Sequence, residues 1–262
     1  MIDCHTHIIP GLDDGSKGME SSIEAIRRMA EGGVSAVICT SHYMTGLYKF
    51  SAEEYQAKFR ELEQEVKHQS IPVTLYPGAE VFLTAGIVED IKKYNLTLAG
   101  SHYVLFETDL NSFPADMQKN IFELLREGFR PVLAHAERYV PVMMKSHEAQ
   151  EMITRSVYIQ MSAASVVGGY GEKVKQTAWK LLNNGWVHIL ASDYHAHTSY
   201  GAFFEARDKI IKHIDKDMAD ILTINHPQAV IDDEKIELEY VYIQNPHHHK
   251  HHHHNPLHGL GL

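Results

Sequence analysis

Acidic and histidine side chains occupy every second position in the opening stretch IDCHTHII, at Asp3, His5 and His7. Residues two apart in a β-strand face the same side, so these three side chains are predicted to project together. Carboxylates and imidazoles are costly to bury without partners, and both are ligands for divalent metal ions. A lone H-x-H pair is weak evidence for a metal site. The pair supports a metal site only if other parts of the chain place further metal-binding residues beside it.

Similar residues follow most of the later apolar runs, at the points where the predicted strands end. Six of the seven predicted strands finish in a histidine or an acidic residue, although these residues are spread over most of the chain. In parallel barrels the C-terminal ends of the strands form the catalytic face, so these side chains are predicted to converge. With Asp14 from the loop after the first strand, the candidate metal ligands are His5, His7, Asp14, His42, Glu80, Glu107, His135, Asp193 and His195.

The number and type of these candidate ligands indicate more than one metal ion. Four carboxylates crowded together would repel one another and have raised pKa values unless cations lay between them. Nine ligands are too many for one ion of coordination number four to six, and they suffice for two or three divalent ions that share bridging carboxylates. Nitrogen and oxygen donors without a thiolate suit manganese, iron or zinc and argue against a structural zinc site.

Short apolar runs alternate with longer charged segments along the chain, which is typical of repeated βα units. Helical spacing or composition predicts helices over 21–31, 53–68, 84–93, 114–127, 149–155 and 172–183, with two more between 202 and 233. The pattern predicts an α/β fold, either a seven-stranded parallel (βα) barrel or a doubly wound open sheet. The seven predicted strands are 2–8, 36–40, 74–76, 103–106, 131–134, 157–160 and 187–191.

Length and composition indicate one large domain over residues 1–245. The 262 residues are 44% hydrophobic, and the formal net charge of −10 provides no general field for nucleic acid. No apolar run approaches the length of a membrane span, and Cys4 and Cys39 lie in apolar runs without a disulfide pattern. We therefore expect a cytoplasmic protein without membrane insertion.

The C-terminal residues 246–262 form a separate, histidine-rich low-complexity tail. Such a composition cannot build a packed core, so the tail is predicted to be disordered. It could be an expression remnant or a metal-binding tract.

Six short segments resemble the PHP (polymerase and histidinol phosphatase) superfamily: DCHTHIIPGLDDG, TSHY, PGAE, LFE, HAER and SDYH. More closely, they are similar to bacterial metal-dependent tyrosine phosphatases encoded with capsule and exopolysaccharide operons. The likeness runs from Met1 to about Asn225. It implies a distorted, TIM-like seven-stranded barrel with a trinuclear site, commonly of manganese. Carried onto this sequence, the metal sets are His5, His7, Glu80 and Asp193, then Glu80, Glu107 and His135, then Asp14, His42 and His195.

The sequence departs from the family pattern at three places. Ser41 and Ala136 stand where relatives often have proline, and the first arginine after His195 is Arg207. If relatives use that later arginine to contact substrate phosphate, phosphate binding here rests on Arg138, or on Arg207 from a less certain position.

The resemblance also suggests roles around the metals. Arg138, in the loop after His135, is predicted to hold two phosphate oxygens. Asp13 is predicted to act as an acid or to support a metal ligand, with orientation of the loop beside Asp14 as the alternative. Tyr43, with Tyr48 and Phe50, could stack on a phenyl ring at the mouth of the site or serve only in packing.

Two other kinds of phosphate chemistry are disfavoured. A cysteine phosphatase needs C-x5-R, but the sixth residues after Cys4 and Cys39 are Pro10 and Thr45. The GGYGE stretch at 168–172 reads as a flexible loop and not as a nucleotide cradle.

The leading hypothesis is a metal-dependent protein-tyrosine phosphatase that acts on the tyrosine-rich tail of a bacterial tyrosine kinase and so regulates capsule synthesis. One alternative is a phosphoesterase for a small molecule such as histidinol phosphate or a nucleotide, and another is a non-catalytic metal-binding protein. The oligomeric state stays open. Four further histidines are expected to be ordinary core or surface residues: His102, His188, His197 and His213.

Overall fold

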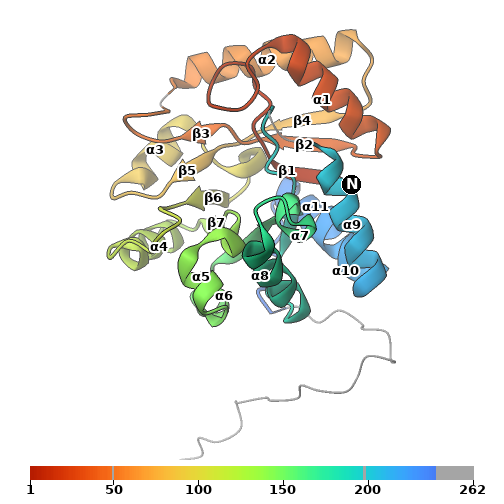
Figure 1. Cartoon of the computed structure of the whole chain (residues 1–262). Helices are drawn as coiled ribbons and strands as arrows, with labels where there is room; N and C mark the ends of the chain where they lie inside the picture. The colour runs from red at the N-terminus through yellow and green to blue at the C-terminus, as the bar shows by residue number, and fades with distance from the viewer. Residues whose placement is uncertain (49, 197–198, 240–262) are drawn as a thin grey trace, which may run out of the picture.

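The computed structural model describes residues 1–48, 50–196 and 199–239, which form parallel strands surrounded by helices (Figure 1). One sheet has three strands in the order β1-β2-β4, and the other has six in the order β3-β5-β6-β7-β8-β9. Every strand pair is parallel. The strands are β1 (Ile2–Thr6), β2 (Ala36–Cys39), β3 (His42–Tyr43), β4 (Thr74–Pro77), β5 (Glu80–Phe82), β6 (Tyr103–Glu107), β7 (Arg130–Leu133), β8 (Tyr158–Ser162) and β9 (Ile189–Ala191).

The described residues form nine strands and not the predicted seven, because a second short strand, β3 or β5, follows shortly after each of the predicted strands 36–40 and 74–76. Residues 40–41 separate β2 from β3, and residues 78–79 separate β4 from β5. Both breaks fall at the same level, since β2 pairs with β4 and β3 pairs with β5. Gly78 lies in this break, where a Cβ atom would approach Ile38 Cγ2 to 2.8 Å, so the close contact requires glycine.

The parallel strands curl so that the ends of β1 and β9 meet. Asp193 N donates a hydrogen bond to His5 O (2.9 Å), and His7 N donates one to Tyr194 O (2.9 Å). The predicted α/β class with parallel strands is confirmed, and the curl brings the C-terminal ends of the strands toward one another.

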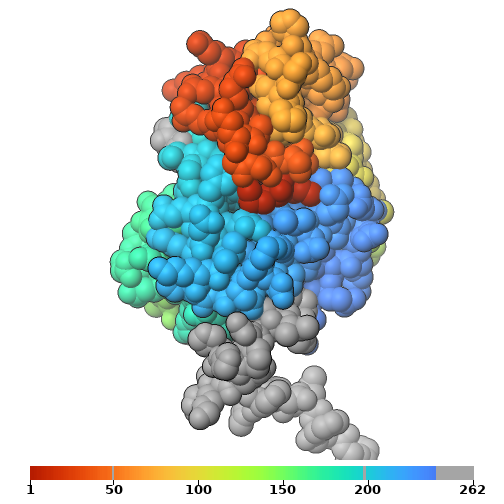
Figure 2. All heavy atoms as spheres, turned by 90° about the vertical axis from the view of Figure 1, so that its right-hand side faces the viewer, coloured from red at the N-terminus to blue at the C-terminus, as the bar shows by residue number. Residues whose placement is uncertain are grey.

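The helices pack on the outside of the curled strands, and the helices near the C-terminus, blue in Figure 2, cover one flank beside the N-terminal segments in red. No helix among the described residues combines the length and apolar composition that crossing a bilayer requires. The helices are α1 (Met19–Glu31), α2 (Ala52–His68), α3 (Ile87–Tyr94), α4 (Met117–Arg126), α5 (Val140–Met144), α6 (His147–Thr154), α7 (Ala163–Val167), α8 (Glu172–Asn183), α9 (Gly201–His213), α10 (Lys216–Asp220) and α11 (His226–Ile231), with short turns η1 (Leu98–Gly100), η2 (Ala136–Arg138) and η3 (Ile221–Asn225).

Helix α2 shows how the sequence sets these elements. Ser51 Oγ accepts a hydrogen bond from Glu54 N (3.0 Å), which satisfies one of the free N–H groups at the start of the helix. Its apolar residues, spaced three or four apart, are buried against the strands, as expected for an amphipathic helix.

The hydrophobic core has two layers, because side chains alternate along the strands. In β6, Val104 and Phe106 belong to the layer beneath the helices, whereas Tyr103 and Leu105 belong to the layer that the strands enclose. The second layer also contains Ile236, from the segment after α11. The predicted tail at 246–262 lies outside the described residues.

Candidate metal centre

The nine candidate ligands lie together at the C-terminal ends of the strands, as the sequence predicted. Three groups among them have ligand atoms within 4.8 Å of one another. The groups are His7, Asp14, His42 and His195; His5, His7 and Asp193; and His42, Glu80 and Glu107. His135 joins them through Glu80, at 3.0 Å from Nε2 to Oε1.

Glu80 is the centre of the cluster, because four imidazole rings contact its buried carboxylate. Oε2 lies 3.1 Å from His5 Nε2, 3.3 Å from His7 Nε2 and 3.2 Å from His42 Nδ1, while Oε1 faces His135. Burial alone would raise the pKa of Glu80, but the charge of His5 and the histidine hydrogen bonds hold it well below its usual range. Burial alone would lower the pKa of His5, yet nearby carboxylates raise it to about 9. The field at the centre therefore favours positive charge.

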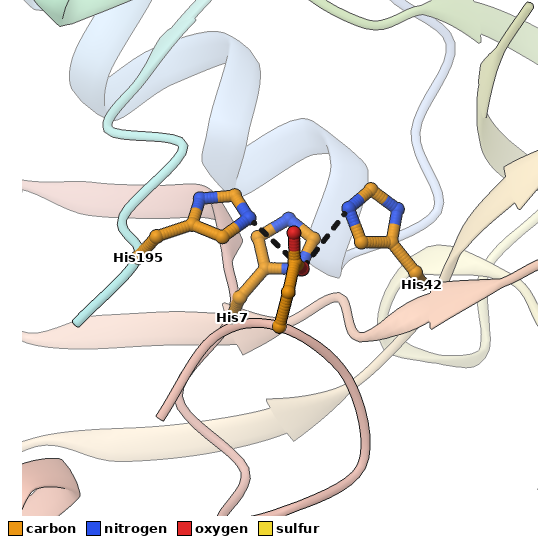
Figure 3. Close-up of side chains that lie close together, drawn as sticks. His7, His42 and His195 are labelled. Carbon is orange, nitrogen blue, oxygen red and sulfur yellow. Dashed lines mark ion pairs between the residues drawn. The ribbon is translucent and has the colours of Figure 1, made fainter. Parts of the chain in front are cut away.

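Asp14 lies between two histidines at the more exposed side of the cluster. Its Oδ1 is 3.4 Å from His195 Nε2 and 3.6 Å from His42 Nε2. Figure 3 shows His7, His42 and His195 converging, and the His7 and His195 rings stack with centroids 4.1 Å apart. These donors come from the segment after β1, from β3 and from the loop after β9, so the curl of the strands brings them together.

Two candidate ligands have backbone conformations that residues other than glycine seldom adopt. His135 has φ 36° and Asp193 has φ 52°, and both follow the end of a strand. Such conformations carry strain and persist where surrounding contacts fix them. Here His135 N donates to Gln160 Oε1 (2.8 Å) and Asp193 N donates to His5 O (2.9 Å). Two of the strained positions in the described chain thus lie at the predicted metal centre.

Gln160 in β8 supports the centre and was missed from the sequence, because it ends the predicted strand 157–160, for which only a histidine or an acidic residue was considered as a ligand. Besides accepting from His135 N, Gln160 Oε1 lies 3.1 Å from His5 Nδ1. This contact turns His5 Nε2 toward Glu80, in the manner of residues that orient metal-binding histidines. A buried glutamine within a strand is the signal that could have identified it.

Asp13 contacts a histidine of the cluster and two backbone N–H groups. Its Oδ2 accepts hydrogen bonds from His7 Nδ1 (2.8 Å) and His42 N (2.9 Å), and Oδ1 accepts one from Gly15 N (3.0 Å). Burial alone would raise the pKa of Asp13, but His7 and the backbone N–H groups lower it to about 2. These contacts are those of a residue that orients His7 and its loop, and the role of Asp13 as an acid stays a prediction.

Asp3 does not share the space of His5 and His7, which corrects the first expectation from the sequence. The strand alternation fails because the register between β1 and β2 is irregular from Asp3 to Thr6. The Asp3 carboxylate instead accepts from Ser192 N (3.0 Å) and Tyr200 Oη (2.9 Å). It holds the end of β9, which leads to Asp193.

Tyr43 and Arg207 are also placed away from the cluster. Tyr43 is fully buried, packs on Phe50, and donates from its hydroxyl to Asp90 Oδ2 (2.9 Å), so the predicted substrate contact gives way to the packing alternative. Arg207 pairs with Asp220 and donates to Thr223 Oγ1 (3.2 Å) on the outer helices. It does not line the cavity at the cluster.

Arg138 lines the open cavity at the cluster, where Nη1 lies 3.2 Å from Asp193 Oδ2. The cavity has a volume of about 240 Å³. Leu110 and Tyr170 also line it and were not predicted. The complete lining is Asp14, His42, Glu80, Glu107, Leu110, His135, Arg138, Tyr170, Asp193 and His195.

The residues present fit a centre for divalent metal ions. The donors are imidazole nitrogens and carboxylate oxygens, the combination that binds manganese, iron and zinc. His135 Nδ1 and Gln160 Nε2 are buried and hydrogen-bond to none of the described residues, so the cluster is not saturated by its own contacts.

Comparison with known proteins identifies relatives over almost the whole chain. CpsB of Streptococcus pneumoniae, a tyrosine-protein phosphatase, is 29% identical over 243 residues, which cover 90% of this chain and all of that protein. The tyrosine-protein phosphatase YwqE of Bacillus subtilis (strain 168) is 28% identical over 196 residues, 74% of this chain and 77% of that protein.

Solved structures show the same fold. One from a study of YwqE and CpsB, described as unique metal-dependent tyrosine phosphatases, superposes with a TM-score of 0.83 at 25% identity, covering 94% of this chain and 98% of that one. A histidinol phosphate phosphatase from Lactococcus lactis shares the fold more distantly, with a TM-score of 0.53 at 12% identity over 80% of this chain and 92% of that one.

A family model for capsular polysaccharide synthesis proteins, CpsB/CapC, matches residues 1–232. The match spans the strands, the helices and the whole cluster of candidate ligands. The chain therefore belongs to the CpsB/CapC family.

Proposed function

We propose that this protein is a metal-dependent tyrosine-protein phosphatase. The observation that carries the proposal is the convergence of nine nitrogen- and oxygen-donor residues, seven of which line one open cavity together with Arg138. The names of YwqE and CpsB as tyrosine-protein phosphatases support the substrate class. A cavity of about 240 Å³ is smaller than most pockets that enclose a whole small molecule, which favours a single side chain of a protein substrate.

Three ligand sets would hold the metal ions. They are His5, His7, Glu80 and Asp193; Glu80, Glu107 and His135; and Asp14, His42 and His195. Metal ions bound there would supply Lewis-acid chemistry, which neutralises phosphate charge and activates water for attack on phosphorus. We propose manganese as the native metal, with iron or zinc as alternatives.

The chain's own residues bind and orient the phosphate. Arg138 can donate two parallel N–H groups to phosphate oxygens, and its position beside Asp193 aims it into the cavity. Asp13 keeps the His7 ring in place through the bond to Nδ1. Tyrosinate, with a parent pKa of about 10, is a fair leaving group. Phosphate transfer to water can therefore proceed without an acid supplied by Asp13.

Finer features belong to the same proposal. Counting β2 with β3, and β4 with β5, as single interrupted strands gives seven strands, which we propose form a distorted barrel. The hydrogen bonds between the ends of β1 and β9 support closure of this barrel. Residues 1–245 would be the catalytic domain, with the tail at 246–262 dispensable. The free, buried Cys4 and Cys39 are compatible with action in the cytoplasm. The tyrosine-rich tail of a bacterial tyrosine kinase is the proposed substrate.

Initial rates on a phosphotyrosine peptide and on histidinol phosphate test this function. We expect manganese-dependent hydrolysis of the peptide, loss on complete chelation, and a rate reduced about 100-fold by Arg138→Ala, in the range for losing a charged hydrogen-bond pair. Arg155→Ala, an exposed arginine on the surface, is the matched control. Peptide turnover that survives chelation would refute the mechanism. Turnover of histidinol phosphate alone would refute the substrate assignment.

A further inference from the structure

Tyr170 contacts Arg138, which lines the cavity at the metal centre. The Arg138 guanidinium carbon lies 4.2 Å from the centroid of the Tyr170 ring, and both residues line the cavity. A guanidinium over an aromatic ring at this distance forms a cation–π contact. The ring therefore supports one face of the group that is proposed to bind phosphate.

The loop that carries Tyr170 between α7 and α8 is held by its backbone. Gly168 and Gly171 flank the tyrosine with φ values of 94° and 93°, a region that favours glycine. Gly169 N donates to Ala164 O (2.8 Å), and Gly171 N donates to Gly168 O (3.1 Å). The GGYGE stretch, expected from the sequence to be a flexible loop, thus has a defined hydrogen-bonded path that directs Tyr170 toward Arg138.

Two neighbours, Asp193 and Tyr170, set the orientation of the Arg138 side chain. Its turn, η2, is fixed through Glu137 Oε1, which accepts hydrogen bonds from Ser162 N (3.0 Å) and Ser165 Oγ. The guanidinium itself is held by Asp193 and by the Tyr170 ring. Asp193 is also a candidate metal ligand, so its carboxylate would bind a metal ion as well as contact Arg138. The Tyr170 ring restrains the guanidinium without using any of its N–H groups.

We propose that Tyr170 is a positioning residue for phosphate recognition. Its ring holds the plane of the Arg138 guanidinium so that the N–H groups stay available to a phosphate in the cavity. This role rests on the proposed function, because it assumes that Arg138 binds the phosphate of the substrate. The alternative, in which the ring stacks on the substrate phenol, is separated from it by the following test.

The test measures the affinity of the manganese-loaded protein for inorganic phosphate, by calorimetry and by competitive inhibition of peptide hydrolysis. We expect Tyr170→Ala to weaken phosphate binding about 3- to 30-fold, to raise KM for the peptide by a similar factor, and to change kcat less. Tyr170→Phe keeps the ring and should restore most of the affinity. Phe122→Ala removes an exposed aromatic ring on α4, away from the cavity, and should change neither value.

A double-mutant cycle gives the decisive outcome. If Tyr170 acts through Arg138, the substitution Tyr170→Ala should have no further effect on kcat/KM or on phosphate inhibition when Arg138→Ala is already present. Additive losses would overturn the proposal. A raised KM with unchanged phosphate affinity would also overturn it and would assign the ring to the substrate phenol. If the wild type hydrolyses no phosphotyrosine, the proposed function fails, whereas phosphate calorimetry on the same variants still decides the role of Tyr170.

Discussion

The two ends of the curled strands carry the same kinds of polar side chain but arrange them in opposite ways. At the C-terminal ends, four imidazoles contact the single carboxylate of Glu80. At the N-terminal ends two donor residues share the carboxylate of Asp233, and both ring nitrogens of His188 have a backbone partner. His102 Nδ1 lies 2.6 Å from Asp233 Oδ2, and Arg130 Nη1 donates to Asp233 Oδ1 (2.9 Å). Ile159 N donates to His188 Nδ1 (3.0 Å), and His188 Nε2 lies 2.9 Å from Leu238 O.

This difference separates a binding site from a structural network. In the network, donors and acceptors pair, and the segment after α11 is fastened to the strands through Tyr103 and Tyr158. In the cluster, several rings compete for the same carboxylate oxygens, and buried nitrogen atoms are left over. Residue type alone does not distinguish the two ends. The two ends differ in whether each polar group finds a matching hydrogen-bond partner among its neighbours.

Glu80→Gln should give the largest effect, and it should disrupt only the cluster of candidate ligands at the C-terminal ends of the strands. The amide keeps the shape of the side chain but removes the charge that several donors share, so we expect turnover to fall about 10³-fold, equivalent to several kcal/mol. Elemental analysis should show fewer metal ions bound per chain. Glu89→Gln makes the same chemical change at an exposed position of α3 and should leave both measurements unchanged. Normal metal content and rate in Glu80→Gln would remove the distinction between the two ends.

The contacts at the N-terminal ends of the strands should make the stability of the protein depend on pH. Burial, and then the charge of His226, lower the pKa of His188 from 6.5 to about 4. Between these values the unfolded chain binds more protons than the folded one, so stability falls as the pH drops. We expect His188 to account for a loss of about 2 kcal/mol between pH 7 and pH 5. Urea unfolding should therefore show a shallower pH dependence in His188→Gln than in the wild type, and equal slopes would contradict the assignment.

Asp13→Asn and Asp233→Asn make the same change at opposite ends and should differ in outcome. Asp13 orients His7, so its substitution should weaken metal binding about 10- to 100-fold, as for other residues that support metal ligands. Asp233 pairs with His102 and Arg130, so its substitution should leave metal affinity unaltered. Metal titration of both variants checks the contrast. Equal losses of affinity would mean that the network at the N-terminal ends also shapes the metal centre.

His102→Ala should have the smallest effect. Its pair with Asp233 is largely exposed to solvent, and such pairs contribute less than about 1 kcal/mol to stability. We expect a decrease of that size or less in the free energy of unfolding, with turnover unchanged. A decrease of several kcal/mol would show that this end depends on the pair far more than its exposure suggests.

The residues recovered from the sequence share one property, which is their position just after an apolar run. His42, Glu80 and His135 follow this rule, and parallel strands bring such positions to one edge. Asp3 was misplaced because the regular alternation of a strand was assumed across an irregular register. Tyr43 was misplaced because its neighbourhood reads as a loop, although the residue is buried in the core. Gln160 and Tyr170 were missed because their roles depend on partners far away in sequence.

The sequence by itself determined the order of strands and helices, the family resemblance and the set of nitrogen and oxygen donors, because these depend on local spacing and on residue type. Only the tertiary structure decided which donor contacts which. It placed Asp13 against His7, turned Asp3 toward Tyr200, and placed the Tyr170 ring against Arg138. The physical reason is that burial, charge and hydrogen bonding are properties of neighbours in space, and the curl of the strands brings residues together that the sequence keeps far apart.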